Sequence, residues 1–80
     1  MNQEEYAREI RCRIGNRVRD FREKQGLTQK NLATISNVDR TVVNRIEKGE
    51  QNVLIDSLIM ISLGLGVPLS ELFEGVDELS

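Results

Sequence analysis

Residues 28–49 read TQKNLATISNVDRTVVNRIEKG, and this stretch decides the fold. Thr28 is a good N-cap, and the apolar residues behind it recur at helical spacing, which predicts a short helix over residues 29–36. Asn37 tolerates the left-handed conformation of a tight turn, so a second helix can follow over residues 40–48. Two short helices joined this closely indicate a helix-turn-helix.

The residues inside this pair are suited to packing one helix on the other. Ala33 is small where the helices must approach, and Val43 and Ile46 face inward from the second helix, as Ile35 does from the first. Asp39 is the second N-cap, and its carboxylate is expected to point back to backbone amides. Such packing leaves one side of residues 40–48 free to enter a DNA major groove.

The flanking segments also predict helices. Residues 4–25 carry one apolar stripe, made by Tyr6, Ile10, Ile14, Val18 and Phe21. Gly15 interrupts that helix and marks a bend or a tight helix contact. Downstream, Asp56 or Ser57 is expected to cap a fourth helix that ends at Gly66. That helix is expected to hold Leu58, Ile59, Ile61, Leu63 and Leu65.

A fifth helix is expected to be short, capped by Ser70 and running through Phe73, with an acidic tail over residues 75–80 that frays. The chain shows no alternating strand pattern and no internal repeat. The prediction is therefore one all-α domain of five helices over residues 1–80, with the helix-turn-helix at 28–49.

Charge is unevenly distributed along the 80 residues. The formal net charge is −2, yet residues 8–48 hold all eleven basic residues and only five acids, a net of +6. The remaining residues hold eight acids and no base. A basic front with an acidic back can hold a phosphate backbone, because the Debye length is only about 8 Å at physiological salt. The alternative is that these charges only keep the protein in solution.

Other protein classes find little support in the composition. No apolar run approaches the roughly 20 residues that cross a membrane, and Cys12 is the only cysteine, which favours a reducing cytoplasm. The chain has no histidine, no nucleophile with a nearby base and no glycine-rich phosphate loop. We therefore expect no enzyme activity, no cofactor, no metal and no small-molecule ligand.

Further motifs stand in register with the central stretch. Residues 19–49 read RDFREKQGLTQKNLATISNVDRTVVNRIEKG, and LIMISLGLGV and LSELF follow at 58–67 and 69–73. Over residues 14–73 the chain resembles the lambda repressor and Cro family, the Xre-type helix-turn-helix transcriptional regulators. The resemblance implies a five-helix fold and sequence-specific binding of double-stranded DNA. Three departures are Asn37 at the turn glycine, Asp39 at a cap position that usually holds a small hydroxyl residue, and Val53 at a loop position that often holds proline.

The resemblance also implies roles for individual residues. Base contacts fall to the exposed side of the recognition helix: Arg40, Thr41, Asn44 and Arg45. Contacts to the DNA backbone are expected from residues that flank it: Thr28, Gln29, Lys30, Lys48 and Asn52. Arginine pairs with guanine and asparagine with adenine through two hydrogen bonds, which suits these positions. The alternatives are solvated arginines and an Asn44 that bonds only its own helix. Arg22 and Glu47 match a structural ion pair.

Proteins of this kind usually bind inverted repeats as twofold dimers. An apolar set at the end of the chain is the expected dimer surface, with Leu69, Leu72 and Phe73 as its members. NVDRT at 37–41 and the loop at 50–55 also resemble controller proteins of restriction–modification systems. A phage repressor and a free-standing regulator stay open at this point. So does an antitoxin or adaptor that keeps the fold but binds a protein.

Overall fold

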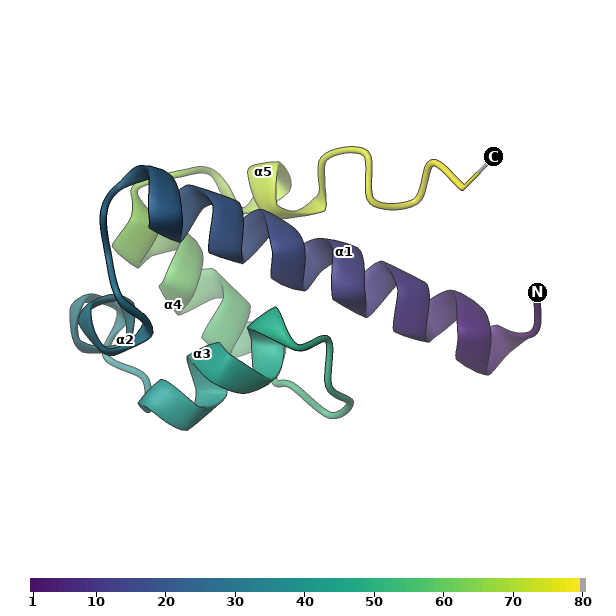
Figure 1. Ribbon diagram of the computed structural model, residues 1–80, viewed down its shortest axis with the longest axis horizontal. Coiled ribbons are helices and arrows are strands. Elements are labelled where there is room, and N and C mark those ends of the chain that lie inside the picture. The colour runs from purple at the N-terminus through teal and green to yellow at the C-terminus, as the bar shows by residue number, and fades with distance from the viewer. Residues whose placement is uncertain (80) are drawn as a thin grey trace.

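The computed structural model describes residues 1–79 and contains five helices: α1 (Gln3–Lys24), α2 (Gln29–Ser36), α3 (Arg40–Glu47), α4 (Ile55–Leu65) and α5 (Leu69–Phe73) (Figure 1). No strand occurs among these residues, which confirms the all-α prediction. The long α1 crosses the molecule, and α3 and α5 pack on different sides of it (Figure 1). Every helix within residues 1–79 is too short or too polar to cross a bilayer.

The turn between α2 and α3 forms as the sequence predicts. The Thr28 hydroxyl accepts a hydrogen bond from the Asn31 amide at 3.0 Å, and the Asn31 side chain accepts one from the Thr28 amide at 3.0 Å. This reciprocal capping box fixes where α2 begins. Asn37 ends α2 with φ 56° and ψ 44°, the left-handed conformation expected of it.

The predicted N-cap position of α3 is confirmed, but its expected side-chain bond is absent, and two other predicted N-caps are wrong. Asp39 stands at the N-cap of α3, but its side chain makes no capping hydrogen bond, so its carboxylate stays exposed. Helix α4 begins at Ile55 rather than after Asp56 or Ser57, which places Asp56 in the first turn, where the helix dipole favours an acid. Helix α5 begins at Leu69, directly after Pro68, rather than after Ser70.

The core lies where α1, α2, α3, α4 and α5 meet. Its buried members are Val18, Leu32, Ala33, Val43, Ile46, Ile61, Leu65 and Leu72. Gly15 explains how α1 and α3 pack so closely, because a Cβ there would meet the backbone carbonyls of Ile46 and Glu47. The glycine therefore marks a tight helix contact rather than a bend.

Four apolar residues of the predicted helices lie at the surface. Ile35 is 55% exposed and Leu63 is 74% exposed, and Ile59 and Tyr6 are also exposed. In α4 the buried side belongs to Ile61 and Leu65, so Ile59 and Leu63 project elsewhere. Tyr6 lies near the start of α1, where the helix extends beyond the other helices (Figure 1).

Candidate nucleic-acid interface

The start of α3 is exposed and carries the first two predicted base contacts. Arg40 and Thr41 are both exposed on the first turn of the helix. Among residues 1–79, no salt bridge engages the Arg40 guanidinium. Five guanidinium donors and one hydroxyl are therefore available to an external partner at this end of α3.

Arg45 lies further along α3 and is held by the loop that follows the helix. Its Nη2 donates to the Gln51 carbonyl at 2.8 Å, and its Nε lies 3.4 Å from the Glu50 carboxylate. The Arg45 side chain keeps 42% of its surface exposed. The loop thus restrains the direction of Arg45 while leaving part of its guanidinium open.

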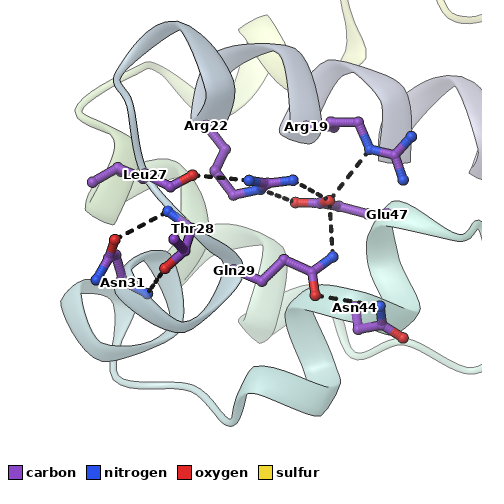
Figure 2. A network of polar contacts seen from close by, with 8 residues as sticks. All are labelled: Arg19, Arg22, Leu27, Thr28, Gln29, Asn31, Asn44 and Glu47. Atoms are coloured by element: carbon purple, nitrogen blue, oxygen red, sulfur yellow. Dashed lines mark hydrogen bonds and ion pairs between the residues drawn. The ribbon is translucent and has the colours of Figure 1, made fainter.

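The end of α3 is tied to α1 by a buried carboxylate. The Glu47 side chain is fully buried, and Arg22 donates to it twice, from Nε at 2.7 Å and from Nη2 at 2.9 Å (Figure 2). Arg22 also donates from Nη1 to the Leu27 carbonyl at 2.8 Å. The predicted structural pair is confirmed, and its two parallel bonds give it a fixed geometry.

Electrostatics keep this pair charged. Burial raises the pKa of Glu47, but hydrogen bonds from Arg22 and Gln29 and the positive charge of Arg22 outweigh burial and leave the pKa below its ordinary value. The hydrogen bond to Glu47 in turn raises the pKa of Arg22. Glu47 is therefore an ionised acceptor at neutral pH.

Gln29 and Asn44 continue this network toward the exposed side of α3. Gln29 Nε2 donates to Glu47 Oε1 at 3.1 Å, and Asn44 Nδ2 donates to Gln29 Oε1 at 3.3 Å (Figure 2). Both side chains are half-buried. Asn44 thus bonds across to α2, which differs from the alternative in which it bonds only its own helix.

The residues predicted to contact the DNA backbone lie around α3. Thr28, Lys30, Lys48 and Asn52 are exposed, at the N-cap and first turn of α2, at the C-cap of α3 and in the loop beyond. The Thr28 oxygen accepts the capping bond from Asn31, and its hydroxyl hydrogen can still be donated. Gln29 is part of the network instead of being fully exposed.

Sequence reasoning missed the partners that hold this region in place. Arg19 Nε lies 3.5 Å from Glu47, and Arg11 Nε donates to the Gly49 carbonyl at 2.9 Å. Arg19 precedes Arg22 by three residues, so the two share a face of α1, and this spacing was a usable signal. The contact of Arg45 with Glu50 and Gln51 had no comparable signal, because it depends on the path of a loop.

The domain has five helices, a capped helix-turn-helix and an exposed first turn of α3. These features define a class, the sequence-specific DNA-binding transcriptional regulators. The chain belongs to the helix-turn-helix family HTH_3, whose model matches residues 18–72. This finding confirms the resemblance inferred from the motifs.

Within this family, the chain is similar to two control proteins and to one solved controller-protein structure. The chain is 41% identical over 71 residues to Control protein C.MunI of a Mycoplasma species, covering 88% of this chain and 96% of the relative. It is 36% identical over 66 residues to Control protein C.BamHI of Bacillus amyloliquefaciens, covering 81% and 82%. The crystal structure of the restriction-modification controller protein C.AhdI from Aeromonas hydrophila matches with a TM-score of 0.75 and 33% identity, covering 79% of this chain and 96% of that one.

Proposed function

We propose that this regulator binds an inverted-repeat operator as a homodimer and inserts α3 into the major groove. The observation that carries the proposal is the exposed pair of Arg40 and Thr41 at the start of a helix whose other end is anchored to α1 through Glu47. Arg40 pairs with a guanine, Thr41 offers a hydroxyl to phosphate and a methyl to thymine, and Asn44 and Arg45 read the next base pairs.

Contacts to phosphates position the protein on the duplex. Thr28, Lys30, Lys48 and Asn52 are exposed beside α3, and the N-terminus of α2 adds backbone amides with the positive end of the helix dipole. Gln29 adds a phosphate contact through whichever amide atoms its network leaves free. Asp39 at the start of α3 is exposed and makes no capping hydrogen bond, so its negative charge opposes these contacts by repelling nearby phosphates.

The homodimer needs an apolar surface that the single chain leaves open. Leu72 is fully buried in the core, so the prediction that it meets a partner is dropped, and only Leu69 and Phe73 stay half-exposed at α5. A larger apolar surface lies along α4, where Ile55, Ile59 and Leu63 recur every four residues and are all exposed. A second copy of the chain is the occupant that a twofold operator requires.

A role as a controller of a restriction–modification system is supported by the similarity to C.MunI, C.BamHI and C.AhdI across most of this chain. The identity of the neighbouring genes tests that role, because the gene of a controller is expected next to genes for a nuclease and a methyltransferase. Unrelated neighbours would favour a phage repressor or a free-standing regulator.

Selection of bound duplexes from a random pool tests the DNA-binding proposal. The wild type is expected to yield an inverted repeat, and its affinity for that repeat is expected to fall steeply with salt, by about 0.9 log units per log unit of salt for each phosphate neutralised. If the protein selects no sequence, and its affinity for a protein partner does not change with salt concentration, it is instead a protein-binding module.

The dimer has its own test in sedimentation equilibrium with and without the selected operator. Leu63→Glu is expected to shift the protein to monomer, whereas Tyr6→Glu, the same kind of change at an exposed residue of α1, serves as a control that leaves the α4 surface intact. A wild type that stays monomeric at high micromolar concentration, even with operator present, would remove the dimer proposal.

A further inference from the structure

We propose that Gln29 is a positioning residue that fixes which atoms Asn44 presents to DNA, so that Asn44 selects adenine. This inference rests on the proposed placement of α3 in the major groove. It assigns Gln29 a part in base specificity in addition to any contact with phosphate. The basis is a chain of hydrogen bonds that runs from a buried charge to the exposed side of α3 (Figure 2).

The series of hydrogen bonds begins at Glu47, whose carboxylate allows only one orientation of the Gln29 amide. An ionised carboxylate only accepts hydrogen bonds, and the Glu47 side chain is fully buried and paired with Arg22. Gln29 must therefore turn its NH2 group toward Glu47, at 3.1 Å. The carbonyl oxygen of Gln29 is then turned toward Asn44.

The same reasoning orients Asn44. Because the Gln29 oxygen only accepts, Asn44 must offer its NH2 group, at 3.3 Å. The Asn44 Oδ1 points away from Gln29 (Figure 2). Asn44 thus presents one acceptor and its remaining N–H donor to the outside.

This pattern of one acceptor and one donor matches adenine. Adenine shows a donor at N6 and an acceptor at N7 in the major groove, whereas guanine shows two acceptors, O6 and N7. An asparagine amide that rotated freely could present its groups in either order. The bond from Gln29 removes that freedom before DNA arrives, and such preorganisation favours one base over the others.

Selection of bound duplexes with four proteins tests the proposal: wild type, Asn44→Ala, Gln29→Met and Lys30→Ala. The position whose preference Asn44→Ala abolishes is expected to be adenine in the wild type. Gln29→Met keeps the side-chain length but removes the bonds, and it is expected to reduce the preference at that position by about tenfold while leaving other positions unchanged. Lys30→Ala, one residue away and exposed, is expected to weaken all sequences equally.

The outcomes separate this inference from the proposed function. A wild type without any sequence preference would overturn both. A second outcome would overturn only the role of Gln29. In that outcome the wild type keeps the base preference that depends on Arg40, and Gln29→Met loses affinity for all sequences equally or not at all. Guanine at the position governed by Asn44 would do the same.

A measurement on the wild type keeps the test independent of any variant's folding. The selected adenine is replaced by purine, which lacks the N6 amino group, and affinity is expected to fall by about tenfold. The same replacement is expected to leave the affinity of Asn44→Ala unchanged. An unchanged wild-type affinity would show that Asn44 accepts no bond from N6 and would refute the proposal.

Discussion

The two ends of α3 differ sharply, although they are only two helical turns apart. At the start, Arg40 and Thr41 are exposed, and Arg40 enters no salt bridge within residues 1–79. At the end, Glu47 is fully buried and takes hydrogen bonds from Arg22, Arg19 and Gln29. One end is free to meet a partner, and the other is fixed to the rest of the molecule.

This difference explains how eight residues can serve both stability and recognition. A base contact needs an accessible donor, and it also needs a helix whose direction does not change on binding. Glu47 joins α3 to α1, and Gly15 lets the two backbones approach closely. The side of α3 that packs on α1 therefore fixes the direction of α3. The exposed start can then carry polar groups without loss of stability.

Removing the anchored end is expected to have the largest effect. Glu47→Ala leaves the Arg22 guanidinium, only 12% exposed, without its partner, and breaking such a buried pair costs about 3–5 kcal/mol. The free energy of unfolding from urea titration measures this loss. Asp20→Ala, an exposed acid on α1, is the control and is expected to change stability by less than about 0.5 kcal/mol.

A loss below about 1 kcal/mol for Glu47→Ala would mean that the two ends of α3 do not differ in what they contribute. The same variant is also expected to bind its operator poorly at about 25 °C or above. Part of the protein is then unfolded, and in the folded part α3 is no longer held in a fixed direction. Lowering the temperature restores only the part of the affinity that was lost through unfolding.

Changing the exposed end is expected to alter recognition and leave stability intact. Arg40→Ala removes a guanidinium that enters no salt bridge within residues 1–79, so the free energy of unfolding is expected to stay within about 0.5 kcal/mol of wild type. Discrimination at one base pair is expected to fall by about 1–3 kcal/mol, measured by competition between operators that differ at that pair. Arg45→Ala is expected to relax a different position.

Both arginine variants together test the assignment of the reading side. If each kept wild-type discrimination at every position of the selected operator, the start of α3 would not be the part of the chain that reads bases. A uniform loss of affinity would instead assign these arginines to phosphates.

Most of the fold was predictable because its signals are local. Thr28, Asn37 and the apolar spacing around Ala33 each act within a few residues, and the observed α2 and its turn follow them. The ion pair of Arg22 and Glu47 was predictable only through resemblance to a family, since 25 residues separate its members.

The exposed side of α4 was not predictable in the same way. The helix reads IDSLIMISLGL, and a helix with apolar residues on nearly every side carries no pattern that selects its buried face. Packing against α2 and α5 decided that Ile61 and Leu65 are buried while Ile59 and Leu63 are not. The Gln29–Asn44 bond was equally hidden, because it requires the crossing of two helices that sequence spacing does not specify.

Acid is expected to weaken the anchored end in a predictable direction. The pKa of Glu47 is lowered in the folded state, so its contribution is complete above the ordinary glutamate value of about 4.3 and is lost as the pH falls through the lower folded-state pKa. Urea unfolding from pH 6 to pH 3 is expected to show the stability gap between wild type and Glu47→Gln narrowing. A gap that stays constant would mean that Glu47 has the same pKa in both states.

The smallest effect is expected at the exposed acid that follows α3. Glu50 pairs with Arg45 at 3.4 Å, but both side chains are more than two-fifths exposed, and such pairs contribute about 0–1 kcal/mol. Glu50→Gln is therefore expected to lower the free energy of unfolding by no more than about 0.5 kcal/mol, with the difference vanishing in 1 M salt. Glu47→Gln, the same chemical change three residues earlier, provides the matched comparison. Equal losses at the two positions would show that burial does not set the strength of these pairs, and the contrast between the two ends of α3 would have to be sought in packing alone.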